Sequence, residues 1–399
     1  MKFQPMGEAL TDFKRGKPLI VVDDPGRENE GDVVVAAEKA TPAVINFMAK
    51  EARGLICVPM VGSDLDRLNV QPMVERGEPR EAAFTVSVDA RKGVTTGISA
   101  HDRARTVRAL VDPKTKPEDL RRPGHIFPLR YKEGGVLVRS GHTEAAVDLA
   151  RLAGLAPAAV ICEIMNDNGS MSRLPALFKF ARRHALQIVT IESLIAYRRR
   201  HEKLVRRLAS ANLPTRYGLY QIHVYEDVPT GEHHVALVRG SVVGESNVLV
   251  RVHSSCFTGD VLHSLRCDCG EQLEKALEKI NEEKKGVLLY MHQEGRGIGL
   301  VNKLHAYALQ ETGLDTVQAN LKLGFSSDLR EYGIGAQILA DLGLSTVRLL
   351  TNNPKKIVGL DGYGLRVTQR VPLQVVPNRH NRSYLATKRA KMGHHLEGL

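Results

Sequence analysis

The chain has 399 residues, which is too long for one typical domain core and indicates two or three domains. Hydrophobic residues make up 43% and charged residues 25%, as in ordinary globular proteins. We find neither an apolar run long enough to cross a bilayer nor a signal peptide, so we expect a cytoplasmic protein without membrane partners. The net charge of +11 suits binding of either nucleic acid or phosphorylated small molecules. Because Trp is absent and aromatic residues make up only 5%, side chains on which bases could stack are sparse. We therefore favour small molecules and expect no nucleic acid.

Strand-like and helix-like segments alternate along the first half of the chain. The predicted strands are 19–23, 33–37, 55–58, 84–88, 135–138 and 160–164. The predicted helices are 43–52, 100–111, 143–153 and 175–185. Ser99, with Asp102 three residues later, resembles a helix-starting cap for the second of these helices. The alternation is typical of an α/β or α+β domain.

Residues 197–208 are rich in Lys and Arg and predict a highly charged helix. We interpret residues 201–211 as a charged helical connector between a first domain, 1–200, and a second domain, 212–399. A solvated helix face explains the charges, and an RNA-binding helix is the alternative. The halves show no internal repeat, so we predict two unrelated mixed α/β domains in tandem.

The second half begins with predicted strands at 217–225, 234–238 and 248–252. A helix at 270–284 and a buried strand at 287–291 follow. Predicted helices at 298–311 and 332–343 flank residues 315–324, and a strand at 346–350 precedes a last helix at 382–393.

Three of the five cysteines, Cys256, Cys267 and Cys269, form a C-x10-C-x-C pattern. An odd number of crowded cysteines suits a metal site in a reducing compartment better than a disulfide framework. Three thiolates would leave one tetrahedral position of zinc open, as in catalytic sites. A structural site would take a fourth ligand, for which His253 and His263 are candidates, and the spacing alone does not decide between the two.

Two further segments suit a phosphorylated substrate: EGRGIG, residues 294–299, is a Gly-rich turn before a helix, and LLTNNPKK, residues 349–356, ends in two Lys. The motifs RVHSSCFTGD, SLRCDCG, QEGRGIGL, DTVQAN, DLREYGIGAQIL and LLTNNPKK, in this order, resemble GTP cyclohydrolase II over nearly all of 213–399. The resemblance implies hydrolytic opening of the imidazole ring of GTP, with release of formate and pyrophosphate and with Mg²⁺ accompanying GTP.

The same resemblance implies the roles of individual residues. Cys256, Cys267 and Cys269 would bind Zn²⁺, whose water attacks C8 of guanine. Asp328 would accept a proton, and Arg330 would be the nucleophile at the α-phosphate. The implied GTP contacts are Arg251, Val252, His253, Ser254, Ser255, Gln272, Glu294, Gly295, Arg296, Thr316, Thr351 and Lys356. Three positions depart from the family: Ser255 and Gln318 stand where Glu is frequent, and His305 stands where Arg is frequent.

The first half carries a dense acidic loop, RENEGD, at residues 27–32. Such carboxylates suit a hard cation or acid/base chemistry, although composition alone favours a solvated polar turn. RSGHT, residues 139–143, suits a phosphate at a helix N-terminus. Glu163 follows an apolar strand and needs a partner or a role, whereas a lone His such as His142 is more often structural.

The motifs DDPGRENEGDVV, TTGISAHDR, RPGHIFPLR, RSGHTEAAVDLARLAG and CEIMNDNGSMSR resemble 3,4-dihydroxy-2-butanone 4-phosphate synthase over about 6–200. The resemblance implies conversion of ribulose 5-phosphate to a four-carbon ketose phosphate and formate, with Mg²⁺ or Mn²⁺ on Glu28 and His142. His125 and Glu163 would be acid/base groups. The implied substrate contacts are Arg27, Glu28, Asp32, Arg139, Ser140, Gly141, His142, Thr143 and Glu163. Asp23, Glu30 and Cys57 fall at more distant positions near this site.

Together the halves resemble the bifunctional enzymes of riboflavin biosynthesis, which implies a homodimer. One alternative, motivated by Ser255, His305 and Gln318, keeps only the first activity and makes the second half a scaffold. Another is a zinc-dependent RNA-binding regulator, motivated by a pI of about 9.4 and the basic segment 198–207. That alternative leaves the RENEGD loop without a use.

Overall fold

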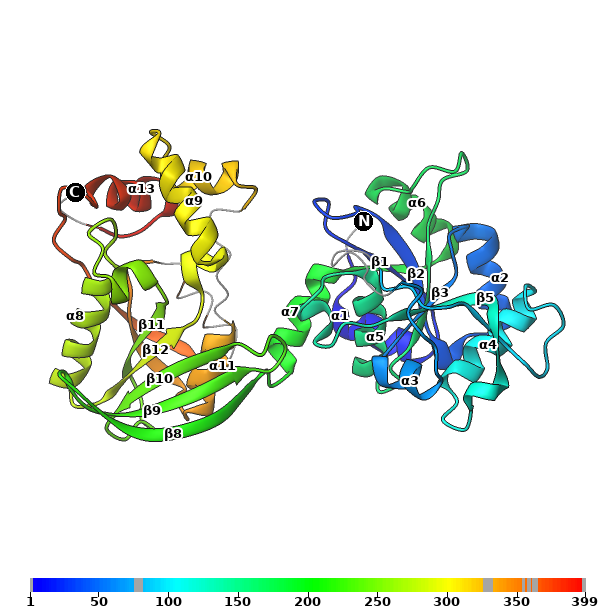
Figure 1. Cartoon of the computed structure of the whole chain (residues 1–399), viewed down its shortest axis with the longest axis horizontal. Coiled ribbons are helices and arrows are strands. Elements are labelled where there is room, and N and C mark those ends of the chain that lie inside the picture. The colour runs from blue at the N-terminus through cyan, green and yellow to red at the C-terminus, as the bar shows by residue number, and fades with distance from the viewer. Residues whose placement is uncertain are drawn as a thin grey trace. The chain divides into compact units, whose positions relative to one another are not determined.

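The structure is a computed structural model and describes residues 3–74, 82–325, 333–353, 356, 360 and 365–396, without the side chain of Arg296. The contacts within the chain divide it into two compact units, Met1–Arg198 and Arg199–Leu399 (Figure 1). Within the described ranges, no helix is both long and apolar enough to cross a membrane.

The first unit is built on a mixed seven-stranded sheet of order β4-β5-β3-β6-β2-β1-β7. Its strands are β1 (Leu19–Val22), β2 (Gly31–Ala36), β3 (Cys57–Met60), β4 (Val88–Ala90), β5 (Leu120–Arg130), β6 (Ala159–Glu163) and β7 (Gln187–Thr190). Its helices are α1 (Met6–Lys14), α2 (Pro42–Phe47), α3 (Gly62–Arg67), α4 (Ala100–Val111), α5 (His142–Leu152), α6 (Leu174–His184) and α7 (Ile191–His201).

Helices cover both faces of this sheet. Ile20 of β1 packs into a core with α2, α4 and α6, whereas the next residue, Val21, packs into a second core with α1, α5 and α7. Because successive strand side chains point to opposite faces, a strand buried on both sides reads as an unbroken apolar run. This explains why the apolar runs at 19–23, 33–37 and 160–164 predicted strands. The structure contains a strand at each of these places, with bounds that differ slightly from the predicted ones.

Several local predictions for the first unit are confirmed and others are wrong. The Ser99 side chain accepts a hydrogen bond from the Asp102 amide at 3.1 Å, and α4 has the bounds predicted for it. Residues 135–138 were predicted as a strand but contain a 3₁₀ turn, Gly135–Leu137, because Gly134 and Gly135 adopt φ of 91° and 63°. Strand β5 was not predicted, since two prolines and a glycine interrupt its apolar pattern.

The second unit has a seven-stranded sheet of order β14-β13-β11-β12-β10-β9-β8. Its strands are β8 (Val205–Thr215), β9 (Gly218–Asp227), β10 (His233–Arg239), β11 (Val248–Ser254), β12 (Gly286–Met291), β13 (Thr346–Leu350) and β14 (Arg366–Val371). Its helices are α8 (Cys269–Glu282), α9 (Gly299–Glu311), α10 (Thr316–Lys322), α11 (Gly333–Asp341) and α13 (Arg382–Met392).

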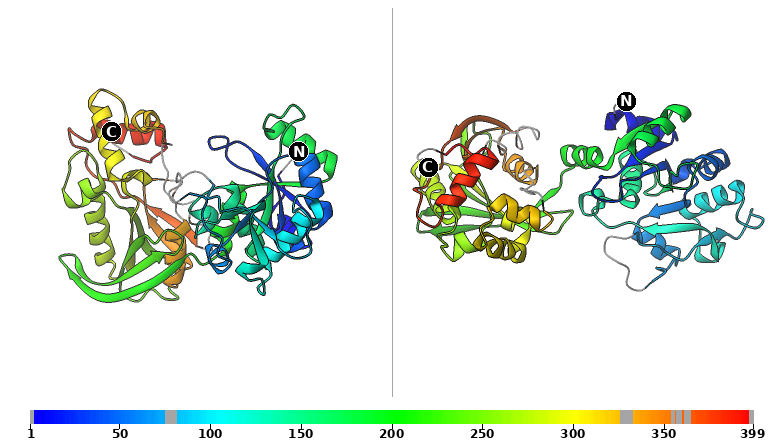
Figure 2. Two further views of the ribbon diagram at one scale, coloured as in Figure 1. Left: turned by 45° about the vertical axis from the view of Figure 1, so that its right-hand side comes forward. Right: turned by 90° about the horizontal axis from the view of Figure 1, so that it is seen from above.

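Strands β8, β9 and β10 form an antiparallel meander, and β12, β11, β13 and β14 are parallel to one another. Helix α8 packs on one face through a core that includes Ala276 and Ile280 with Leu249 and Leu288. Helices α9, α10 and α13 gather beyond one end of the sheet (Figures 1 and 2). They stand where the parallel strands end, which is the usual place for a ligand site in such sheets.

The prediction of a charged helix at 197–208 is wrong in its second part. Helix α7 ends at His201, and β8 begins at Val205, so residues 205–211 belong to the second sheet and not to a helical connector. The side chain of Val205 is buried and β8 pairs with β9 along its length, which a helix could not satisfy. The exposed side chains of Arg206 and Arg207 lie outside this core and form ion pairs with Glu226 and Asp341, respectively.

Candidate active sites

The acidic loop of the first unit joins β1 to β2 and is organised by Asp23. One carboxylate oxygen of Asp23 accepts hydrogen bonds from the amide of Glu28 at 3.0 Å and from the Arg27 guanidinium at 3.1 Å. The other accepts from the amide of Glu30 at 2.8 Å. The loop is therefore held by three hydrogen bonds to a buried carboxylate, so a freely solvated turn does not describe it.

Helix α5 begins at His142, whose buried ring faces this loop. His142 Nδ1 lies 3.7 Å from Glu28 Oε2, and His142 Nε2 lies 3.9 Å from Asp32 Oδ1. Burial would lower the pKa of His142, but the carboxylates of Asp32, Glu28 and Asp23 raise it to about 9. The interaction with His142 is the main reason that the pKa of Glu28 falls to about 2.

Asp23, Glu28 and His142 each offer a ligand atom within 4.8 Å of the other two. Two carboxylates and one imidazole form a donor set that fits a hard divalent cation. Glu28 and His142 were predicted as metal ligands, whereas Asp23 was expected only near the site.

Two acidic residues lie next to each other on neighbouring strands of the same site. Asp32 on β2 is the register partner of Glu163 on β6. Asp32 is only 2% exposed, and burial, together with the charge of Glu163, raises its pKa to about 7. Among the described residues, Asp32 Oδ1 accepts no hydrogen bond. A buried carboxylate oxygen that lacks a hydrogen-bond donor among the described residues is suited to accept a hydrogen bond from a ligand hydroxyl or to take part in proton transfer.

His125 lies on β5 and is held by a residue that the sequence did not reveal. Its Nδ1 is 2.7 Å from Asp89 Oδ2, and its amide donates to Asp89 Oδ1 at 2.9 Å. The Glu163 carboxylate accepts from the amide of Leu55 at 2.8 Å. Since β5 and β6 flank β3 and Cys57 pairs with both Phe127 and Ile161, the register brings His125 and Glu163 level with Leu55.

The segment RSGHT forms the start of α5, with Gly141 as its N-cap residue. A Cβ atom on Gly141 would lie 2.7 Å from Arg139 Nη1 and 3.1 Å from Arg27 Nη2, so both guanidinium groups converge there. Arg139 is oriented by an ion pair with Glu144 at 2.6 Å. Two cations at a helix N-terminus form an arrangement that binds anions such as phosphate.

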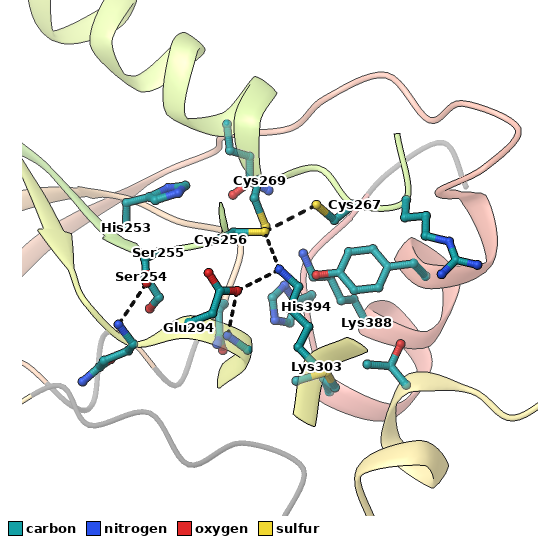
Figure 3. A pocket seen from close by; sticks show the side chains of 18 of the residues that line it. His253, Ser254, Ser255, Cys256, Cys267, Cys269, Glu294, Lys303, Lys388 and His394 are labelled. Atoms are coloured by element: carbon teal, nitrogen blue, oxygen red, sulfur yellow. Dashed lines mark hydrogen bonds and ion pairs between the residues drawn. The ribbon is translucent and has the colours of Figure 1, made fainter. Parts of the chain in front are cut away.

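The second unit contains a pocket of about 130 Å³ into which the three clustered cysteines point (Figure 3). Cys256 follows β11, and Cys267 and Cys269 stand at the start of α8. Their sulfur atoms lie within 4.8 Å of one another, with 3.7 Å between Cys256 and Cys267. Hydrogen bonds from Cys267 and Cys269, together with the Lys303 ammonium, lower the pKa of Cys256.

The two histidines considered as fourth ligands do not join the cysteines in the described part of the chain. His253 Nε2 instead lies 3.1 Å from both carboxylate oxygens of Asp260, and the side chain of His263 is exposed. A three-thiolate set that finds no fourth protein ligand among the described residues fits a soft metal ion that keeps a position for water or substrate.

Lys303 on α9 is a pocket residue that the sequence did not single out. Its ammonium lies 3.1 Å from Cys256 Sγ and 2.8 Å from Glu294 Oε1 (Figure 3). The other oxygen of Glu294 accepts from the amide of Phe257 at 2.6 Å. One carboxylate thus connects α9 to the loop that carries the first cysteine.

Most residues predicted to contact GTP line this pocket. They are Arg251, His253, Ser254, Ser255, Gln272, Glu294, Gly295, Thr316, Thr351 and Lys356. Val252 contributes its carbonyl, which accepts from Lys356 Nζ at 2.8 Å. The side chain of Arg296 and the whole of Asp328 and Arg330 lie outside the described residues. Pocket residues that were not predicted include Tyr307, Tyr384, Lys388, Met392 and His394.

Of the three departures from the family pattern, only Ser255 lines the pocket. Its hydroxyl accepts from the amide of Gln293 at 3.1 Å. Gln318 accepts from the amide of Asp315 at 3.0 Å and completes a capping box at the start of α10, a role that either Gln or Glu can fill. The side chain of His305 is exposed on α9.

Comparison with known proteins assigns each of the two units to a protein family. The family model of 3,4-dihydroxy-2-butanone 4-phosphate synthase matches residues 7–197, and that of GTP cyclohydrolase II matches residues 206–372. Riboflavin biosynthesis protein RibBA of Endomicrobium trichonymphae is 60% identical over 396 residues, covering 99% of this chain and 98% of the relative. RibBA of Aquifex aeolicus (strain VF5) is 57% identical over 397 residues, covering 98% of each chain.

Among solved structures, RibBX from A. baumannii, described as a two-domain 3,4-dihydroxy-2-butanone 4-phosphate synthase, is 37% identical. It superimposes with a TM-score of 0.70 and covers 92% of this chain and 99% of its own. The chain therefore belongs to the RibBA family of riboflavin biosynthesis proteins, with a 3,4-dihydroxy-2-butanone 4-phosphate synthase domain followed by a GTP cyclohydrolase II domain.

Proposed function

We propose that both domains of this bifunctional riboflavin biosynthesis enzyme use the two sites described above. The first domain, a lyase, converts D-ribulose 5-phosphate to 3,4-dihydroxy-2-butanone 4-phosphate and formate. The second, a hydrolase, converts GTP to 2,5-diamino-6-hydroxy-4-(5-phosphoribosylamino)pyrimidine, formate and pyrophosphate. The observation that supports this most is that side chains from motifs far apart in sequence converge on one site in each domain.

In the first site, Glu28 and His142, with Asp23 beside them, are the residues that would hold Mg²⁺ or Mn²⁺. The bound cation would stabilise the enediolate formed when a proton is removed next to the carbonyl group. Mg²⁺ and Mn²⁺ both prefer oxygen ligands, which the two carboxylates of this set supply, so the donor set supports either ion.

The same site contains groups for phosphate binding and proton transfer. Arg27 and Arg139, with Ser140, Gly141 and Thr143 at the helix start, would bind the phosphate of ribulose 5-phosphate. The raised pKa of Asp32 suits a group that exchanges a proton with a substrate hydroxyl near neutral pH.

His125 and Glu163 are the proposed acid/base residues. Asp89 holds the Nδ1 side of the His125 ring, which leaves Nε2 for proton transfer. The hydrogen bond from the Leu55 amide holds the Glu163 carboxylate in place for proton transfer.

In the second site, Cys256, Cys267 and Cys269 would hold Zn²⁺, which supplies an activated water for attack on C8 of guanine. The pocket walls carry cations such as Arg251, Arg266 and Lys356, which suits the triphosphate of GTP and its accompanying Mg²⁺. By matching position, we assign proton transfer to Asp328 and attack on the α-phosphate to Arg330. Arg296 is assigned to the phosphates on the same basis.

We also infer a homodimer in the cytoplasm from family membership. We assign the synthase to 1–200 and the cyclohydrolase to the remainder of the chain, including 205–211 because these residues lie in β8. Small molecules remain the expected partners. A labelled RNA retained by the protein at physiological salt would instead favour the zinc-dependent RNA-binding alternative.

The decisive experiment measures formate release from GTP and from ribulose 5-phosphate by the purified full-length protein with Zn²⁺ and Mg²⁺. We expect formate in both reactions and about one zinc ion per chain. Cys267→Ser should abolish zinc retention and the GTP reaction while leaving the ribulose 5-phosphate reaction as the internal control. Formate from ribulose 5-phosphate alone, with zinc still bound, would support the alternative of an inactive second domain.

A further inference from the structure

The C-terminal segment lies beyond the region matched by the GTP cyclohydrolase II family model, which ends at residue 372. It nevertheless builds a wall of the cysteine pocket through Tyr384, Lys388, Met392 and His394, two of which are labelled in Figure 3. The segment has further contacts: Lys391 of α13 forms an ion pair with Asp315, and the amide of His395, after the helix, donates to the carbonyl of Asn352 at 3.0 Å.

Lys388 reaches from α13 to the loop that carries two of the three cysteines. It is 8% exposed, and its ammonium lies 2.7 Å from Asp268 Oδ1. Asp268 is 1% exposed and stands between Cys267 and Cys269 in the sequence. A buried carboxylate at this position requires a partner, because burying an unpaired charge costs several kcal/mol.

The contact belongs to a longer network. Asp268 Oδ2 accepts from Gln272 Nε2 at 2.6 Å, and Gln272 Oε1 accepts from Arg251 Nη2 at 2.6 Å. Arg251 Nη1 then donates to the carbonyl of Leu350 at 2.9 Å. Both oxygens of Asp268 are thus used, and the cysteine loop is connected to α13 on one side and to the ends of the parallel strands on the other.

Charge balance also favours a positive side chain such as Lys388 at this position. Three thiolates and Asp268 carry four negative charges when ionised, and a divalent metal ion would offset two of them. Lys303, beside Cys256, and Lys388, beside Asp268, supply two positive charges within 3.1 Å of members of this set. Groups in the layer around metal ligands commonly orient those ligands and tune metal affinity.

We propose that Lys388 is a positioning residue for the zinc site and acts through Asp268 on the loop of Cys267 and Cys269. The C-terminal helix thereby contributes a residue that supports the metal site. This inference rests on the proposed zinc site of the second domain. It differs from that proposal because it concerns a residue that touches neither the metal nor the reacting atoms.

The test uses the full-length protein and compares Lys388→Met with Lys388→Arg, which keeps the charge. Lys391→Met is the matched control, because Lys391 lies on the same helix and pairs with Asp315 at a half-exposed site. Zinc affinity is measured by competition with a chromophoric chelator. The thiolate-to-cobalt charge-transfer band of the Co²⁺-substituted protein reports the geometry of the cysteine loop.

We expect Lys388→Met to weaken zinc binding by about 10- to 100-fold and to shift the cobalt band. Lys388→Arg should recover most of the affinity, and Lys391→Met should stay within about threefold of the wild type. The ribulose 5-phosphate reaction should not change in any of these variants. Adding Asp268→Asn to Lys388→Met should cause no further loss, because the lysine acts through that carboxylate.

Wild-type affinity and an unshifted cobalt band in Lys388→Met would overturn the inference, as would an equal loss in Lys391→Met. If Lys388→Met does not fold, the double variant with Asp268→Asn leaves no unpaired buried charge and is measured in its place; an unshifted band there overturns the inference equally. A wild-type protein that binds no zinc would instead overturn the proposed zinc site itself, and the inference with it.

Discussion

Replacement of Gly54 by alanine tests how the first site positions Glu163. A Cβ atom at position 54 would lie 2.4 Å from the Glu163 carbonyl oxygen, 2.5 Å from Glu163 Oε2 and 2.7 Å from its amide nitrogen. Gly54 is not among the glycines with positive φ, so alanine fits its backbone conformation. The effect of Gly54→Ala is therefore steric, and the three atoms nearest to the new methyl group all belong to Glu163.

The magnitude follows from these distances. An ordinary contact for Cβ begins near 3.4 Å, so the Glu163 backbone has to move by roughly 1 Å. The carboxylate cannot turn aside without losing its 2.8 Å hydrogen bond from the Leu55 amide. A misplacement of about 1 Å lowers rates by about 10²-fold, and overpacking costs about 1–3 kcal/mol of stability. We expect kcat/KM for ribulose 5-phosphate to fall about 10²-fold and the GTP reaction to stay unchanged.

The assay is formate release from each substrate by the same preparation. Gly7→Ala is the matched control: a Cβ there meets no atom within 4 Å, so this exposed helix position should gain about 0.4–1 kcal/mol of stability without loss of activity. Retention of the ribulose 5-phosphate reaction within threefold in Gly54→Ala would refute the placement of Glu163. Equal loss of both reactions would show general destabilisation and refute the local explanation.

Two further variants test other parts of the structure. Asp89→Asn should lower the ribulose 5-phosphate reaction by about 10²- to 10⁴-fold, because an amide does not orient the His125 ring as the carboxylate does; activity within threefold of the wild type would rule out this partnership. Burial lowers the pKa of His234 from 6.5 to about 4. Between these two pH values the unfolded chain binds more protons than the folded chain, so the stability of the fold decreases as the pH falls from 6.5 to about 4. His234→Gln should remove roughly 3 kcal/mol of this acid sensitivity, measured as the shift of the second domain's calorimetric transition between pH 7.5 and 4.5. An equal shift in the wild type and the variant would contradict the assignment.

Local signals account for the elements that were predicted well. Helix α4 begins where Ser99 caps it, and strand β13 has the predicted bounds because an apolar segment lies between polar turns. Strand β8 was missed for a different reason: its exposed basic side chains resemble a helix face, and only pairing with β9 makes it a strand. Pairing partners lie outside the segment, so its own sequence cannot reveal them.

The sequence by itself determined the two families, the motif residues and the cysteine set, since these depend on residue types at short, fixed spacings. Only the tertiary structure decided which distant side chains support them. Asp89 meets His125 across 36 positions, Lys303 meets Cys256 across 47, and Lys388 meets Asp268 across 120. None of these contacts leaves a periodic or local pattern, because each arises where the folded path of the chain brings two charged or polar groups within hydrogen-bonding distance.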